Sequence, residues 1–138
     1  MSTLAAVNLK NPSSATNNVV LATTGDLQFN SGYGSAATAY GCRAWVNFNG
    51  TGTVAIRASG NVSSITDNGT GDYTVNFTTA MVDANYAFTI SGYQNTTGGG
   101  SIAYGTGQTY TTSAVRVKTI NLGTADLDMQ NVSVAIFR

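Results

Sequence analysis

Apolar and polar side chains alternate residue by residue in Cys42-Arg43-Ala44-Trp45-Val46-Asn47-Phe48. Because successive side chains of a β-strand point to opposite faces, this stretch predicts a half-buried strand. Cys42, Ala44, Val46 and Phe48 are expected on its inward face, with Trp45 between them on the outward face. Alternation of this kind is typical of antiparallel sheets that pack one face on a core.

Further strands follow at intervals of about ten residues, the spacing expected of a β-sandwich or small barrel. They are predicted over residues 53–57, 62–66, 73–77, 86–90, 110–119 and 132–136. Turns rich in Asn and Gly separate them, and residues 67–72 predict a hairpin turn. No stretch carries the apolar stripe of a helix. We therefore expect an all-β fold, an antiparallel β-sandwich of jelly-roll-like or Ig-like type, over residues 41–138.

Residues 1–40 have a different character from the rest of the chain. They hold its only proline, Pro12, and two stretches of polar or small residues, 11–18 and 31–38. Between these stretches, Val19-Val20-Leu21 predicts one short strand, followed by a turn at residues 24–26. The segment is too short for a core of its own, so we expect an extended N-terminal attachment arm and linker. Val19, Val20 and Leu21 are candidate residues of a subunit interface.

Trp45 is a large apolar side chain on the strand face that is predicted to point away from the core. A neighbouring subunit would cover it, and symmetric homo-oligomers are the usual way in which a soluble protein covers such a face. Trp45 is therefore a further candidate for the subunit interface. Packing beneath the N-terminal arm is the alternative.

The chain carries few charges, which limits the partners it is suited to. Charged residues make up 9% of the sequence, and six Lys and Arg residues balance six acidic ones. A protein that binds nucleic acid normally has a basic face, because phosphate contacts supply most of its affinity. We therefore expect no nucleic acid as partner. No run of 18 apolar residues and no signal-peptide pattern occurs, so we also expect no membrane contact and synthesis in the cytoplasm.

The titratable residues do not form a catalytic pattern. The sequence has no histidine, which excludes Ser/His/Asp and Cys/His mechanisms and imidazole metal sites. Its acidic residues are all aspartates in predicted turns or loops, where Asp normally accepts local backbone hydrogen bonds. We expect no enzyme, with no catalytic residue, no cofactor and no metal. A calcium ion in the loops at residues 67–72 or 126–128 is the alternative left open.

The longest irregular stretch of the domain, residues 92–107, is bracketed by tyrosines and rich in amide side chains. Tyrosine combined with amide and hydroxyl groups is suited to recognising sugars or protein epitopes. The alternative is that these tyrosines cap the core, since tyrosine is also a favoured strand residue. The candidate receptor-contact residues are Tyr93, Gln94, Asn95, Tyr104, Gln108 and Tyr110.

One long block of sequence resembles a known family. It reads AWVNFNGTGTVAIR over residues 44–57, NVSSITDNGTGDYTVNF over residues 61–77 and DANY over residues 83–86. Over residues 44–90 it resembles a tail-fibre-like β module of tailed-bacteriophage virion proteins. Residues 9–21, with the Gly25-Asp26 turn that follows, resemble an N-terminal arm of such fibre proteins.

The resemblance implies a structural protein of the virion, assembled as a homotrimer. It further implies that the arm binds other virion proteins and that the β domain projects outward, where host surface glycan or protein becomes a partner. The chain is shorter than typical tail fibres and has no long shaft repeat. A capsid decoration protein that stabilises the head is therefore the alternative, and the expected location is the virion, on either the tail or the capsid surface.

Overall fold

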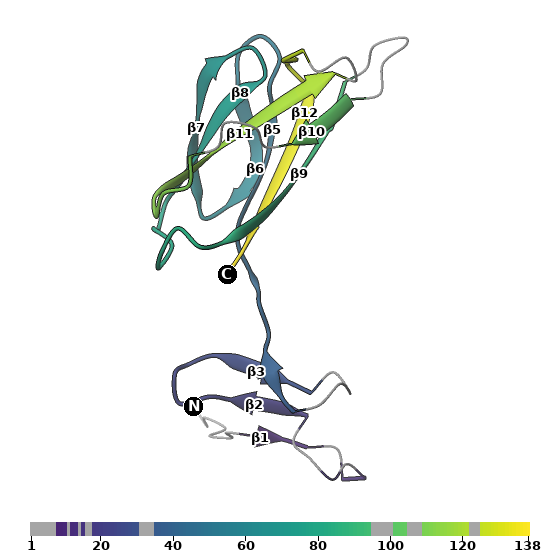
Figure 1. Cartoon of the computed structure of the whole chain (residues 1–138), viewed down its shortest axis with the longest axis vertical. Coiled ribbons are helices and arrows are strands. Elements are labelled where there is room, and N and C mark those ends of the chain that lie inside the picture. Colours follow the sequence, from purple (N-terminus) through teal and green to yellow (C-terminus); the bar gives the residue numbers. More distant parts are fainter. Residues whose placement is uncertain are drawn as a thin grey trace. The chain divides into compact units, whose positions relative to one another are not determined.

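In a computed structural model of the chain, the described residues are 8–10, 12–13, 15, 18–30, 35–94, 101–104, 109–121 and 125–138. These residues form β-strands that pair antiparallel in four-stranded sheets. None of them forms a helix, and so none forms a helix that could cross a membrane. The prediction of an all-β, antiparallel protein is confirmed. The chain divides into two compact units, Met1–Tyr40 and Gly41–Arg138 (Figure 1).

The N-terminal unit contains a small meander sheet, in which four short strands pair in the order β1-β2-β3-β4. The strands are β1 (Asn8–Leu9), β2 (Val19–Leu21), β3 (Leu27–Phe29) and β4 (Ala37–Thr38). Strand β2 and the turn after it were predicted, and Gly25 has the positive φ, 87°, that such a turn requires. The other three strands, β1, β3 and β4, lie in segments that the sequence predicted to be an extended arm and linker. Each is too short to show a period-two pattern.

The C-terminal unit contains two sheets, ordered β10-β11-β8-β7 and β6-β5-β12-β9 (Figure 1). The first sheet consists of β7 (Val62–Gly69), β8 (Asp72–Phe77), β10 (Ser101–Tyr104) and β11 (Ala114–Asn121). The second consists of β5 (Cys42–Asn49), β6 (Ala55–Gly60), β9 (Ala87–Tyr93) and β12 (Asn131–Phe137). The predicted hairpin joins β7 to β8, whereas β10 lies in the stretch predicted to be irregular.

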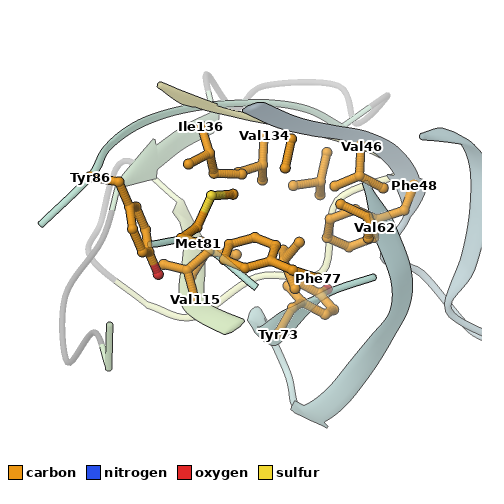
Figure 2. Close-up of a cluster of buried hydrophobic side chains, with 14 of the residues drawn as sticks. Val46, Phe48, Val62, Tyr73, Phe77, Met81, Tyr86, Val115, Val134 and Ile136 are labelled. Atoms are coloured by element: carbon orange, nitrogen blue, oxygen red, sulfur yellow. The ribbon is translucent and has the colours of Figure 1, made fainter. Parts of the chain in front are cut away.

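The two sheets of the C-terminal unit share one hydrophobic core. Figure 2 shows Val46, Val134 and Ile136 on one side of it, with Tyr73 and Val115 on the other. The rings of Phe48 and Tyr73 meet edge to face across the core, with centroids 5.1 Å apart. Burial of these side chains is the main source of stability for the unit. The core residues are Ala44, Val46, Phe48, Val62, Tyr73, Val75, Phe77, Met81, Tyr86, Val115, Val117, Met129, Val132, Val134 and Ile136.

Strand β5 follows the predicted alternation except at its start. Ala44, Val46 and Phe48 are buried and Trp45 is exposed, as predicted, but the inward position predicted for Cys42 is wrong because its side chain is exposed. Ile136 lies opposite Ala44, whereas the next residue of β12, Phe137, lies opposite Cys42. Arg43 is thus the extra residue of a β-bulge, which interrupts the alternation and puts Cys42 on the outward face.

A loop at residues 125–130 closes one end of the core through polar contacts. Gly71 N donates to Asp128 Oδ1 at 2.7 Å, and the hydroxyl of Tyr73 lies 2.9 Å from the same oxygen. Thr119 N donates to Gly71 O at 2.8 Å, and Leu127 N donates to Thr119 O at 2.9 Å. Burial raises the pKa of the Tyr73 hydroxyl above its ordinary value, so the group remains a donor to the carboxylate.

Candidate functional site

The outward side of the β6-β5-β12-β9 sheet brings together aromatic and polar side chains from four strands. Trp45 lies opposite Gly60 on one neighbouring strand and Ala135 on the other. Directly opposed residues of antiparallel strands share a face. We call this surface the outer face and define it by Trp45, Asn47, Arg57, Tyr93, Asn131 and Ser133.

Trp45 is the largest side chain of the outer face, and a glycine makes room for it. A Cβ atom added at Gly60 would lie 2.5 Å from Nε1 of the Trp45 indole and 2.9 Å from its Cδ1. The indole therefore lies directly over the bare backbone of Gly60, packed against the sheet. Trp45 remains 44% exposed. One side of the ring thus rests on the strand while the other is exposed.

A polar network lies beside the indole, on the same face. Asn47 Nδ2 donates to Asn131 Oδ1 and, at 2.9 Å, to Ser133 Oγ. Arg57 reaches over the sheet, with Nη1 at 3.4 Å from Asn131 Oδ1 and Nη2 at 2.5 Å from Gln130 O. The register of β5 and β6 shifts at this point, between Asn47 and Phe48, and Arg57 is the extra residue of β6. The network holds amide and guanidinium groups in fixed positions at the surface.

Tyr93 borders the network on the side away from Trp45. It lies opposite Asn131 in the register of β9 and β12 and is 60% exposed. Counting two strand spacings across the sheet and four residues along it, the Cα atoms of Trp45 and Tyr93 are roughly 15–17 Å apart. Next to Tyr93, Oε1 of Gln94 accepts a hydrogen bond from Gln130 N at 2.9 Å. The structure thus places Tyr93, one of the predicted receptor-contact residues, on the outer face, and bonds Gln94, another of them, to the backbone next to Asn131.

Tyr110 lies elsewhere. Its ring packs against those of Tyr86 and Phe88, with centroids 5.3 and 5.8 Å away. Phe88 packs against the core and sits near the opposite end of β9 from Tyr93. The structure therefore does not bring Tyr110 and Tyr93 together. Tyr104 belongs to β10, while Asn95 and Gln108 lie outside the described residues.

The residues proposed for a subunit interface come from both units of the chain. Val19 and Leu21 lie on one face of the N-terminal sheet and Val20 lies on the other, because strand side chains alternate. Val19 and Val20 are half-buried, and Leu21 is exposed. Trp45 belongs to the outer face of the C-terminal unit.

Each of the six aspartates accepts a hydrogen bond from a neighbouring group. Three of them accept from a residue two positions away in a turn: Asp26 accepts from Thr24 Oγ1, Asp67 from Gly69 N and Asp83 from Asn85 N. The other three are bound by groups from other strands or loops. Asp72 is paired with Arg116, Asp126 with Lys118, and Asp128 accepts from Gly71 N. Within the described part of the chain, no three Cys, Asp or other metal-ligating side chains of this kind lie close enough to hold an ion.

The pair formed by Asp72 and Arg116 is the strongest charge interaction of the β7-β8-β11 surface. Arg116 Nε donates to Asp72 Oδ1 at 2.7 Å and Nη2 donates to Oδ2 at 2.5 Å, a bidentate arrangement. Lys118 Nζ lies 3.7 Å from the same carboxylate and 2.8 Å from Asp126. The hydrogen bond from Arg116 holds the pKa of the Asp72 carboxyl below its ordinary value, against the effect of burial. The pair fixes the β7-β8 hairpin to β11.

Replacing Asp72 by asparagine is expected to destabilise the fold in a pH-dependent way. A carboxyl whose pKa is depressed in the folded state stabilises the protein above its unfolded pKa, about 4, and this contribution disappears as the pH falls. At pH 7 we expect Asp72→Asn to lower the free energy of unfolding by roughly 1 kcal/mol. The effect is small because the Arg116 side chain is 42% exposed and solvent screens the pair. The difference in free energy of unfolding between wild type and Asp72→Asn should become smaller as the pH falls from about 5 to about 3.

Urea denaturation of both proteins at several pH values measures this difference. Asp67→Asn in the same hairpin is the matched control, because Asp67 is exposed and its carboxylate accepts from Gly69 N. A free-energy difference between wild type and Asp72→Asn that stays constant from pH 7 to pH 3 would contradict the assigned role of the ion pair.

Comparison with known proteins shows a likeness of fold. No protein-family model matches the chain, and no curated protein matches it. A solved structure that is similar is the phiAB6 tailspike, in complex with three-repeated oligosaccharides of Acinetobacter baumannii surface polysaccharide. The likeness has a TM-score of 0.53 at 17% sequence identity and covers 98% of this chain. This chain spans 30% of the tailspike chain.

Proposed function

We propose that this chain is a structural component of a tailed-phage virion, a trimeric fibre-like appendage whose β domain binds saccharide on the host surface. Two similarities support a phage origin: the resemblance of residues 44–90 to a tail-fibre-like module, and the likeness of fold to a phage tailspike. The tailspike structure contains bound oligosaccharides of a bacterial surface polysaccharide. Saccharide is therefore the host ligand that we favour over protein.

The outer face is the observation that carries the proposed binding. Sugars offer two kinds of surface to a protein, a patch of C–H groups and a rim of hydroxyls. The open side of the Trp45 indole suits the first, because an aromatic ring is a large rigid contact surface with little conformational freedom to lose. The amides of Asn47 and Asn131 and the guanidinium of Arg57 suit the second, since they are held in place by one another. Tyr93 extends this surface, and Gln94 is bonded to the backbone of Gln130 beside it.

We propose binding without catalysis. Hydrolysis of a glycosidic bond commonly uses two carboxyl groups on either side of the bond. In this chain, the aspartate carboxylates accept hydrogen bonds in turns and loops or form ion pairs. None of them belongs to the outer face. The outer face instead presents amides, a guanidinium group and aromatic rings.

The remaining architecture fits a projecting appendage. We propose that the two sheets of Gly41–Arg138 constitute a β-sandwich that carries the outer face. Residues 1–40 serve as the attachment segment, through which the chain joins other virion proteins. In a trimer, three outer faces would act together, and multivalent contact raises the overall affinity without any new contact within a single site.

Immunogold labelling of intact virions tests the proposal. Antibody raised against the full chain should bind at the tail, and prior adsorption of the antibody with purified chain should remove the label. Label over the head would instead indicate the alternative, a capsid decoration protein. Virions without label at either place would contradict a role in the virion, provided that the antibody detects the purified chain under the same conditions.

A further inference from the structure

The N-terminal sheet has one face made of apolar side chains. Register pairs Leu9 with Val19, Val19 with Phe29 and Leu21 with Leu27. Paired residues share a face, and so do residues two apart on one strand. Phe29 is also paired with Ala37. We call this surface the apolar face of the N-terminal sheet, and it consists of Leu9, Val19, Leu21, Leu27, Phe29 and Ala37.

Apart from Val19, which is half-buried, this apolar face is open, whereas the opposite face is partly covered. Leu9 is 56% exposed, Leu21 51%, Leu27 49% and Phe29 46%. On the other side of the same strands, Val20, Gln28 and Thr38 are half-buried. A sheet in a soluble protein normally shows the reverse, with its apolar side turned to a core. None of the described residues of the N-terminal unit is buried, so among them the sheet has no core.

We infer that the apolar face of the N-terminal sheet is the surface through which copies of this chain associate around a common axis. The inference rests on the trimeric assembly proposed above and names the part of the chain that forms it. A face placed on a symmetry axis meets copies of itself, so any charge on it would meet like charge. The charged residues of Met1–Tyr40 are Lys10 and Asp26, and neither belongs to the apolar face. The face is therefore electrostatically compatible with its own copies.

The amount of apolar surface sets how much of the association this face can supply. Four side chains of Leu or Phe size, each about half exposed, present on the order of 300–400 Å² per chain. Each chain would bury this area whether two or three copies meet, and it is about half of the roughly 800 Å² per partner of a standard interface, so the N-terminal sheet would supply part of the contact between copies. Strands of two or three residues also gain most from such packing, since small isolated sheets are marginal in water. Assembly and folding of the N-terminal sheet would then be coupled.

The test compares two double variants of the full chain that differ in the face they alter. Leu21→Thr with Leu27→Thr changes a cross-strand pair of the apolar face. Val20→Thr with Gln28→Thr changes the adjacent cross-strand pair on the opposite face. Threonine keeps a high strand propensity at all four positions. Sedimentation equilibrium gives the oligomeric state over a range of concentrations, and Trp45 fluorescence reports on the folding of the C-terminal unit.

We expect the wild-type chain to be trimeric and the Leu21/Leu27 variant to dissociate, with a dissociation constant raised roughly a hundredfold. The Val20/Gln28 variant should remain trimeric. A trimer that persists in the Leu21/Leu27 variant, or that is lost equally in both variants, would overturn this interface and leave the proposed function intact. A wild-type chain that is monomeric at every concentration would overturn both the interface and the proposed trimer, with another virion protein as the remaining occupant of the face. If the double variant is insoluble, Leu27→Thr alone is compared with Gln28→Thr in the same way.

Discussion

Replacing Gly71 by alanine is expected to destabilise the C-terminal unit by about 3–5 kcal/mol, a large part of the stability of a typical domain. Two costs add. Gly71 has φ of 63°, a region that costs a non-glycine residue about 1–2 kcal/mol. A Cβ atom there would also lie 2.4 Å from Thr119 O and 2.6 Å from Leu127 N. Both are backbone atoms, held by the hydrogen bond between Leu127 N and Thr119 O, so they cannot move aside cheaply.

Gly52→Ala is the matched control for this substitution. Gly52 has nearly the same φ, 62°, but a Cβ atom there would have nothing within 4 Å. The control therefore isolates the backbone cost, and we expect it to lose only about 1–2 kcal/mol. Thermal unfolding measures both, and Gly71→Ala should lower Tm by about 15 °C or more. Equal decreases in Tm for Gly71→Ala and Gly52→Ala would show that the loop at residues 125–130 does not pack against Gly71 as described.

The pattern of single strands could be predicted from sequence because it is a local property. In β5 the alternation of residues 44–48 gave the right faces, and the Asn- and Gly-rich turn at residues 67–72 gave the right hairpin. Each of these signals lies within a few consecutive residues. For the same reason, the local signal was lost in the N-terminal unit, where a strand of two residues such as β1 or β4 cannot show a period.

The outer face could not be predicted, because it depends on which strands are neighbours. The sequence predicted that Trp45 lies on an outward face. Its packing on Gly60 depends on the pairing of β5 with β6, which the sequence does not show. Asn131 likewise meets Asn47 and Tyr93 through two different strand pairs. The alternation of Asn47 with Val46 and Phe48 shows on which face of the strand Asn47 lies. It does not show which residues of neighbouring strands Asn47 contacts. Cys42 shows the same limit, since a bulge in the pairing changed its face without changing the local pattern.

Trp45→Ala is expected to have the largest effect on function, lowering adsorption of the virion to permissive cells roughly tenfold to a hundredfold. Truncating a tryptophan that is a main contact of a binding surface commonly costs about 2 kcal/mol or more of binding free energy. Each 1.4 kcal/mol corresponds to about a factor of ten in affinity. Several copies in one appendage would multiply the loss. The fold should tolerate the change, because the side chain is 44% exposed and lies outside the core.

Substitutions at and around Trp45 test whether the indole ring itself makes the host contact. Gly60→Val should also reduce adsorption, because its side chain would occupy the position 2.5 Å from Nε1 and displace the ring from the sheet. Trp45→Phe should restore part of the adsorption, since a smaller aromatic surface remains. Tyr110→Ala is the control at a distance. Its ring packs on Tyr86 and Phe88, away from the outer face, so adsorption should stay within about twofold of wild type at a temperature where the variant is folded.

The same variants show whether Trp45 contacts a host saccharide or a neighbouring subunit. Binding of the purified chain to surface polysaccharide extracted from permissive cells is measured together with its oligomeric state. If Trp45→Ala loses polysaccharide binding and stays trimeric, the outer face is the host contact and the subunit contact lies elsewhere. If it dissociates the trimer instead, the open side of the indole is an intersubunit surface. Because the two outcomes differ in a mass and in a binding constant, neither can be mistaken for the other.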